Sequence, residues 1–216
     1  MNIPYVRSSR EGGGYIDLCS YLMESRTLFI GPELTTEMAS IFCMQMMFLH
    51  ESDDPISVYL NCYGGSVPAG LAVIDSINAT NLKVPVHTYC IGECVGIAVA
   101  ILASGRSGHR HAFPLSRLSL YQEWYGVESL WGAQSQDHDE RQRLMKLVER
   151  ALRSRTNLGK LTETEFSSHL TALNFFDPER AKGYGIVDNI CGAPLPPPIS
   201  LEKPGESSSE TARPVG

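Results

Sequence analysis

The chain has 216 residues, of which 43% are hydrophobic, and its 18 Lys and Arg stand against 24 Asp and Glu, for a formal charge of −6. This length suits one domain, or at most two small ones, with a core that buries roughly 70% of the unfolded surface. The charge is modestly negative and the basic residues are scattered, so we expect no nucleic-acid partner.

The first half of the chain predicts alternating strands and helices after a polar, glycine-rich N-terminal arm at residues 1–20. Short apolar runs closed by glycine predict strands, and apolar residues three or four apart after a Thr or Ser cap predict helices. The expected strands are 27–30, 56–61 and 84–91, and the expected helices are 35–50, 66–78 and 94–103.

The second half predicts further strands and helices before a tail of different composition. We expect a strand pair at 109–113 and 117–121, a long charged helix at 134–155, short helices at 163–173 and 177–183, and a last strand at 185–190. Repeated strand, crossover helix and strand units predict an α/β class with a mostly parallel sheet. Residues 21–191 are expected to form this domain, and the proline- and serine-rich residues 192–216 a disordered tail.

The cysteines and the apolar segments indicate a protein of a reducing compartment. The six cysteines include no C-x-x-C pair and lie mostly in apolar runs, where a free thiol packs as a small hydrophobic side chain. The apolar run Cys94–Ala103 is too short to cross a bilayer, which needs about 20 residues. Met1–Asp17 lacks the apolar centre of a secretory signal and is too short and glycine-rich for a transit peptide. We therefore expect no membrane anchor and no export.

Two glycine-bearing turns, Asn61–Ser66 and Cys90–Gly96, follow predicted strands and open predicted helices. Backbone N–H groups converge at such turns, with the positive end of a helix behind them, which suits an oxyanion. The alternative is that these glycines only make tight strand-to-helix turns. The chain has no G-x-x-x-x-G-K-[ST] phosphate loop, so we expect no nucleotide and no other cofactor.

Five stretches carry a family resemblance, in this order: Leu28–Gly31, Gly64–Ala72, Cys90–Gly92, Phe113–Arg117 and Ala181–Asp188. They resemble the ClpP family, peptidase family S14, which provides the proteolytic subunits of the ATP-dependent Clp protease. The likeness covers about residues 27–190, and Ile3–Ser8 also resembles the N-terminus of chloroplast-type members. The resemblance implies a ClpP/crotonase-like superhelix of β-β-α units with a protruding handle helix.

Members of the ClpP family are serine peptidases with a Ser, His, Asp triad. The resemblance implies that none of the three triad positions in this chain carries the family's residue. The nucleophile position is Gly96, the base position is Tyr121, and the third position is Leu173, with Asn174 as the alternative because a short insertion blurs the register. Glycine has no nucleophile, a tyrosine with an ordinary pKa near 10 is a poor base, and leucine cannot orient an imidazole. The resemblance thus implies that acyl-enzyme chemistry is absent.

The resemblance implies that the oxyanion-hole positions of the family are retained, and the sequence offers one candidate replacement for the nucleophile. By resemblance, Gly65 and Ile97 keep the backbone positions of the oxyanion hole. Cys94 lies near a predicted helix start, where a thiol pKa falls, and His109 or His111 is a candidate base for it. Its displacement by two residues from the nucleophile position favours core packing instead. The histidines have no further ligand in metal-binding spacing, so we expect no metal site.

By resemblance, the chain is a non-catalytic, ClpR-like structural subunit of the Clp protease core, inactive on its own. ClpR subunits share heptameric rings with active ClpP subunits in chloroplasts and cyanobacteria. The implied partners are ClpP and ClpR subunits in a tetradecamer-type core, a Clp ATPase chaperone, and unfolded protein substrates. The implied location is the chloroplast stroma, with the cyanobacterial cytoplasm as the alternative.

Three other readings of the sequence stay open. The chain could be an active Clp serine-type endopeptidase with a divergent site, which a fluorophosphonate or thiol-directed probe would reveal. It could be a crotonase-type acyl-CoA enzyme, which also uses paired backbone N–H groups but needs acid or base carboxylates, and only Glu93 stands near the turns. It could also be a decayed copy without a role.

Overall fold

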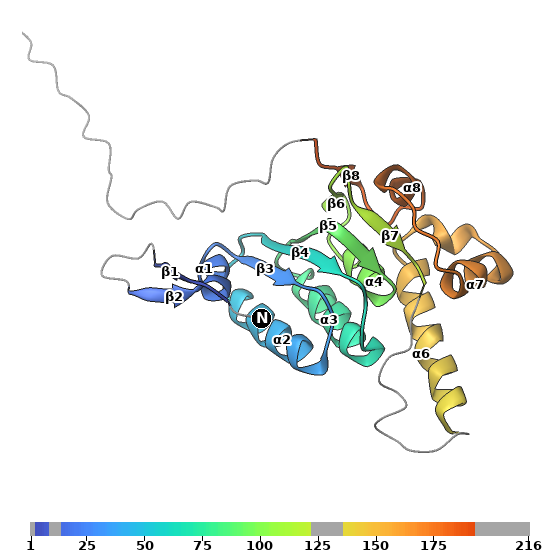
Figure 1. Cartoon of the computed structure of the whole chain (residues 1–216), viewed down its shortest axis with the longest axis horizontal. Coiled ribbons are helices and arrows are strands. Elements are labelled where there is room, and N and C mark those ends of the chain that lie inside the picture. The colour runs from blue at the N-terminus through green and yellow to red at the C-terminus, as the bar shows by residue number, and fades with distance from the viewer. Residues whose placement is uncertain (1–2, 9–13, 122–135, 193–216) are drawn as a thin grey trace, which may run out of the picture.

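The computed structural model describes residues 3–8, 14–121 and 136–192 (Figure 1). The predicted disordered tail, apart from Gly192, and the first residues of the predicted helix at 134–155 lie outside this part of the chain. Among the described helices, none combines the length and the apolar character that a bilayer span requires.

A hairpin and a short helix form in the N-terminal region, where the sequence predicts only an arm. β1 (Tyr5–Arg7) pairs antiparallel with β2 (Tyr15–Asp17), and α1 (Leu18–Glu24) follows directly. The Asp17 carboxylate caps this helix by accepting a hydrogen bond from the Ser20 N–H at 2.9 Å. Strands of three residues are too short to show a clear alternation in the sequence.

A six-stranded sheet forms the centre of the molecule and confirms the predicted α/β class with parallel strands. Five strands lie side by side, each parallel to the next: β3 (Thr27–Ile30), β4 (Ile56–Cys62), β5 (Val86–Val95), β6 (Arg110–Ala112) and β8 (Asn189–Ile190). β7 (Arg117–Ser119) pairs in parallel with the last residues of β5. Parallel neighbours require crossover connections, which helices provide here.

Helices pack together on one face of this sheet (Figure 1): α2 (Thr36–Leu49), α3 (Val67–Thr80), α4 (Ile97–Ala103) and α6 (Gln136–Arg153). The predicted caps are present, since the side chains of Thr35 and Ser66 accept hydrogen bonds from backbone N–H groups at the starts of α2 and α3. Between sheet and helices, Val58, Leu60 and Ile101 are fully buried.

α6 extends away from the sheet in Figure 1, as expected for a protruding helix, while the end of α6 joins the core. Its apolar stripe, Leu144, Val148 and Leu152, is buried. The chain then returns to the sheet edge through three short elements: η1 (Asn157–Lys160), α7 (Glu163–Thr171) and α8 (Pro178–Gly183).

The predicted boundary between the third strand and the following helix is wrong. β5 does not end at Gly92 but continues to Val95, and α4 begins at Ile97 rather than at residue 94. Gly92 has φ +79°, and the register between β4 and β5 shifts beside it. This irregularity lets the strand continue and reach β7.

Two predictions about the later strands are also wrong. β6 and β7 do not pair with each other, because both lie parallel to β5. The predicted strand at 185–190 is reduced to β8, Asn189–Ile190. Gly185, with φ +71°, turns the chain after α8, and Asp188 turns toward Arg110 before the strand begins.

Candidate functional site

The two glycine-bearing turns lie against each other at the carboxyl ends of β4 and β5. Gly64 and Gly65 have φ values of +109° and +135°, and Gly96 has φ +57° and ψ −122°. A Cβ atom on Gly64 would lie only 3.3 Å from the Val95 carbonyl oxygen, so the first turn touches the second. These conformations favour glycine, which explains why both turns are glycine-rich.

The backbone N–H groups of Gly65 and Ile97 are available where the sequence analysis expects oxyanion donors. Leu34 donates its N–H to the Gly64 carbonyl at 2.8 Å, so the N–H of the same peptide, that of Gly65, points the opposite way. Ile97 is the first residue of α4, where an N–H has no acceptor within the helix. The two N–H groups therefore belong to the two turns that lie against each other.

β7 brings the three predicted triad positions to one part of the molecule. The Gly96 N–H donates to the Ser119 carbonyl at 2.8 Å, two residues before Tyr121. On the other side of β7, Leu118 and Phe176 exchange backbone hydrogen bonds of 2.8 and 3.0 Å in an antiparallel bridge. The segment that contains Leu173 and Asn174 thus follows the same edge.

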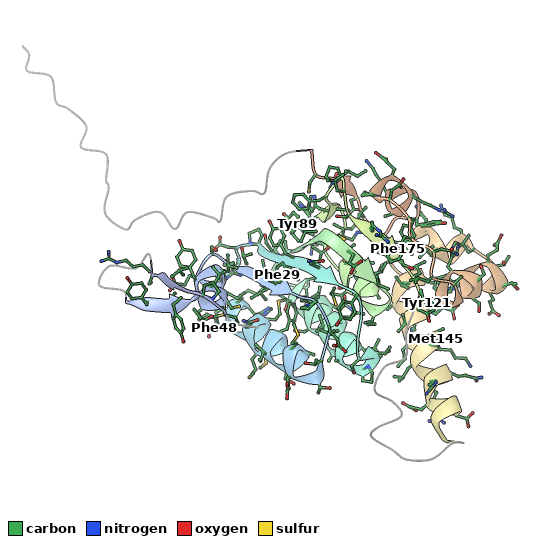
Figure 2. All side chains as sticks on the ribbon, viewed as in Figure 1. Phe29, Phe48, Tyr89, Tyr121, Met145 and Phe175 are labelled. Carbon is green, nitrogen blue, oxygen red and sulfur yellow. The ribbon has the colours of Figure 1, made fainter. Side chains whose placement is uncertain are left out.

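Among the side chains at these three positions, the phenol of Tyr121 is the one ionisable group. Gly96 carries none, Tyr121 is half-buried, and Leu173 is 57% exposed. Nearby, the Arg117 guanidinium lies 4.1 Å from the centre of the Phe175 ring, in a cation–π contact (Figure 2 labels Tyr121 and Phe175). An arginine and a phenylalanine at this edge supply neither a nucleophile nor a base.

Cys94 is not placed as a substitute nucleophile. Its side chain is fully buried on the helix-covered face of the sheet, with Sγ 4.0 Å from the Leu60 carbonyl oxygen. Burial, reinforced by the Cys90 thiol, raises the pKa of Cys94 well above its usual value. His111 stacks on Tyr89, on the opposite face of the sheet. The structure therefore separates the thiol from its candidate base.

Two carboxylates, and not one, lie near the glycine turns. Glu93 donates its backbone N–H to the Asn61 side-chain oxygen at 3.2 Å, which fixes its position beside the first turn. Glu33, which the sequence analysis missed, accepts a hydrogen bond of 3.3 Å from the Tyr63 hydroxyl. Glu33 could have been predicted from its position in the loop after β3, because the loops that follow parallel strands gather at the carboxyl edge of the sheet. The two carboxylates make the rim of the turns acidic.

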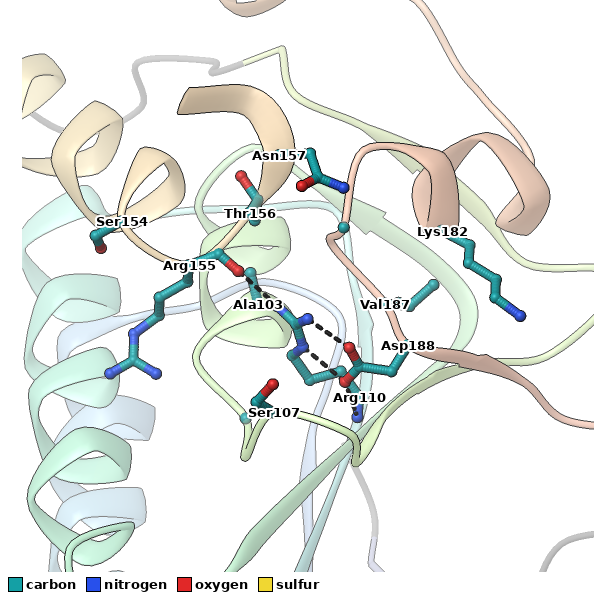
Figure 3. A pocket seen from close by; sticks show the side chains of 12 residues that line it. Ala103, Ser107, Arg110, Ser154, Arg155, Thr156, Asn157, Lys182, Val187 and Asp188 are labelled. Atoms are coloured by element: carbon teal, nitrogen blue, oxygen red, sulfur yellow. Dashed lines mark hydrogen bonds and ion pairs between the residues drawn. The ribbon is translucent and has the colours of Figure 1, made fainter. Parts of the chain in front are cut away.

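A pocket of about 770 Å³ lies away from the glycine turns, at the C-terminal end of α6 (Figure 3). The Arg110 guanidinium, 8% exposed, pairs there with both carboxylate oxygens of Asp188 and donates to the Arg155 carbonyl at 2.9 Å. Burial alone would raise the pKa of Asp188, but the hydrogen bonds from Arg110 outweigh it and hold that pKa below its usual value. This ion pair joins β6, the end of α6 and the segment before β8, so we assign it a structural role.

Metal binding has no geometric basis in the described ranges, where no three His, Cys, Asp or Glu side chains gather closely enough for one ion. His87 and His109 stack with ring centres 4.2 Å apart. Burial, followed by the nearby His109 and His111, lowers the pKa of His87 to about 4, so this side chain is neutral near pH 7.

Known proteins resemble this chain over most of its length. A family model described as Clp protease matches residues 10–194. The ATP-dependent Clp protease proteolytic subunit of Bdellovibrio bacteriovorus is 31% identical over 192 residues, which are 87% of this chain and 89% of that protein. The crystal structure of the ClpP protease catalytic domain from Plasmodium falciparum has a TM-score of 0.69 and 26% identity, over 83% of this chain and 93% of that one.

These similarities agree with the α/β fold and its parallel sheet. The likeness to a ClpP catalytic domain confirms the predicted ClpP-like fold. The family match and the bacterial relative confirm the resemblance on which the site positions were placed. The chain therefore belongs to the Clp protease family, the ClpP serine peptidases of family S14.

Proposed function

We propose that this chain is a non-catalytic, ClpR-like subunit of the ATP-dependent Clp protease core. Members of the family form rings that work with Clp ATPases and degrade proteins. The observation that carries the proposal is the set of residues at the triad positions, Gly96, Tyr121 and Leu173, which lie along one edge without a nucleophile, a base or an orienting acid. Cys94, buried with a raised pKa, supplies no replacement.

The structure around the triad positions supports a subunit whose role is in assembly. The two glycine turns, the N–H groups of Gly65 and Ile97 and the extended α6 keep the shape of a peptidase subunit. In this role the chain lines the degradation chamber beside active ClpP subunits, and those subunits hydrolyse the unfolded protein. We place the assembly, with its Clp ATPase chaperone, in the chloroplast stroma or in a cyanobacterial cytoplasm.

The purified assembly is expected to show no reaction of this chain with a fluorophosphonate probe. Loss of a serine nucleophile and its base lowers kcat by roughly 10⁶, so labelling of this chain falls below detection. Intact-mass analysis of the treated complex measures the label on each subunit. Any active ClpP subunit in the same preparation is the positive control. A covalent adduct on this chain, or cleavage of a fluorogenic peptide by the chain alone, would contradict the proposal.

The exposed apolar stripe of α2 is expected to contact neighbouring subunits. Four of its side chains are 52–75% exposed in the single chain: Ile41, Met44, Met47 and Phe48. We expect Met47→Glu to weaken assembly at least about tenfold, about 1.4 kcal/mol, because a charge would enter an apolar contact. Light scattering after size-exclusion chromatography measures this loss. Leu82→Glu places the same charge at a side chain that is 90% exposed and off the helix, and should assemble normally.

A further inference from the structure

The pocket at the C-terminal end of α6 carries more positive than negative charge. Three cationic side chains line it, Arg110, Arg155 and Lys182, against one carboxylate, that of Asp188. Arg110 and Asp188 neutralise each other, because the guanidinium pairs with both carboxylate oxygens. The charges of Arg155 and Lys182 remain, so the pocket has an excess of two positive charges in a chain whose formal charge is −6.

The Arg155 guanidinium has unused hydrogen-bond donors. Within the described part of the chain it meets one acceptor, the Ser104 carbonyl, at 3.5 Å, which is near the upper limit for a hydrogen bond. Burial, followed by the like charge of Arg110, lowers the pKa of Arg155, but an arginine in a protein keeps its charge near pH 7. Because a guanidinium presents several N–H donors in a fixed fork, most of those of Arg155 are left for a ligand.

Main-chain hydrogen bonds hold Arg155 at the pocket. Its carbonyl accepts the Arg110 side-chain N–H at 2.9 Å, and its backbone N–H donates to the Leu152 carbonyl at 3.2 Å. Both contacts use backbone atoms of Arg155, so a substitution of its side chain leaves the ion pair and the wall of the pocket in place. The contribution of the guanidinium to binding can therefore be measured separately.

The size and the polarity of the pocket suit a small anionic ligand. Its volume of about 770 Å³ lies within the range of roughly 300–1,000 Å³ that is typical of ligand sites. Figure 3 shows the end of the Arg155 side chain on one side of the buried ion pair and Lys182 on the other. Three hydroxyl groups line the same pocket: those of Ser107, Ser154 and Thr156.

A phosphate group matches the charge of this pocket. A phosphomonoester carries about −1.5 to −2 charges at pH 7 and three acceptor oxygens, whereas a carboxylate carries a single negative charge. Guanidinium groups bind phosphate through two parallel N–H···O bonds, and lysine binds it as a point charge. The excess of two positive charges, one of them on an arginine with free donors, therefore favours phosphate over a carboxylate.

We propose that this pocket binds a phosphate group, either as the free ion or on a small molecule. The Arg155 guanidinium holds the phosphate oxygens directly, and Lys182 contributes its charge from the opposite side. Arg110 is a positioning residue, because it neutralises Asp188 and fixes the Arg155 carbonyl. The pocket lies away from the glycine turns, so this binding does not depend on whether the chain is catalytic.

The test is isothermal titration calorimetry of the assembly with which the chain purifies, with inorganic phosphate as the probe and the ionic strength held constant. The native assembly should show saturable binding with a Kd on the order of 1 mM or lower. Arg155→Gln should weaken binding at least about tenfold, because charged hydrogen bonds are lost. Lys182→Gln should weaken it about threefold, since a solvent-exposed charge contributes less.

Arg143→Gln and Lys160→Gln are the matched controls and should bind phosphate like the native chain. Both side chains are exposed and neither lines the pocket. These variants alter this chain alone, so any binding by other subunits is the same in each comparison. Arg155→Lys keeps the charge but not the fork, and should weaken binding several-fold.

Glycerol 3-phosphate and glycerol identify the source of the phosphate group. Tighter binding of glycerol 3-phosphate than of inorganic phosphate would assign a phosphorylated small molecule, equal binding would assign the free ion, and glycerol should not bind. Absence of saturable phosphate binding would overturn the proposal, as would an equal loss in Arg155→Gln and Arg143→Gln. Binding of a glutamate-rich peptide in place of phosphate would also overturn it, because the pocket would then serve an acidic protein segment.

Discussion

Replacing Gly65 with alanine is expected to destabilise the protein by about 4 kcal/mol or more, from a clash and from backbone strain together. A Cβ atom here would lie 2.4 Å from the Leu34 carbonyl oxygen and 2.7 Å from the Leu34 nitrogen, and both are backbone atoms that cannot rotate away. The φ of +135° is also unfavourable for any residue with a side chain. Urea unfolding followed by circular dichroism measures the loss.

Gly108→Ala is the matched control for Gly65→Ala. Gly108 also has a positive φ, +87°, but a Cβ there would meet nothing within 4 Å. Its substitution should cost only the conformational strain, about 1–2 kcal/mol. Equal destabilisation by the two variants would contradict the claim that the close approach of Leu34 and Gly65 shapes the first glycine turn.

Asp188→Asn is expected to cost about 3–5 kcal/mol, the usual penalty for removing one partner of a buried ion pair. The Arg110 guanidinium is 8% exposed and would keep its charge without a counter-charge. Asp188 also accepts the N–H groups of Gly108 at 2.8 Å and Arg110 at 3.1 Å, which an amide replaces less well. Asp53→Asn is the control, because Asp53 forms a surface ion pair with Lys83 and is 82% exposed, so its loss should cost under about 1 kcal/mol.

The pH dependence of stability gives a second readout for Asp188. Its pKa is lower in the folded protein than the usual 3.8, so the ion pair contributes stability that is fully present above that value. This contribution is lost as the pH falls through the folded-state pKa. The stability difference between the native chain and Asp188→Asn should therefore be constant near neutral pH and shrink below about pH 4. A difference that grows in acid would show that another group dominates.

The first crossover units could be predicted from the sequence because their signals are local. β3, α2, β4 and α3 begin and end within two residues of the predicted positions. Alternating or helical apolar spacing identifies each element, and Thr35 and Ser66 mark helix starts that depend only on the next three residues.

The boundary between β5 and α4 could not be predicted, because tertiary pairing decides it. Cys94 and Val95 open an apolar run that suits either a strand or a helix. Pairing with β7, Glu93 opposite Arg117 and Val95 opposite Ser119, holds them in the strand. Gly185 is a similar case, since its positive φ turns the chain after α8, so the strand predicted to begin at residue 185 begins only at Asn189.

The two glycine-bearing turns of the candidate site could be predicted from the sequence. Paired turns at the ends of neighbouring parallel strands lie together as a consequence of strand order alone. The Glu33 carboxylate beside Tyr63 was missed because a contact between two loops 30 residues apart leaves no periodic signal. The placement of Gly96, Tyr121 and Leu173 rested on family resemblance, because no local pattern distinguishes an empty triad position from an ordinary residue.

The conformation of Gly96 has a consequence for any attempt to build a nucleophile at this position. Its φ of +57° and ψ of −122° cost glycine almost nothing, but would cost a residue with a side chain about 1–3 kcal/mol. Under the proposed function, Gly96→Ser alone would add this strain without supplying an imidazole at position 121 or a carboxylate at position 173, so a single substitution would not create peptidase activity.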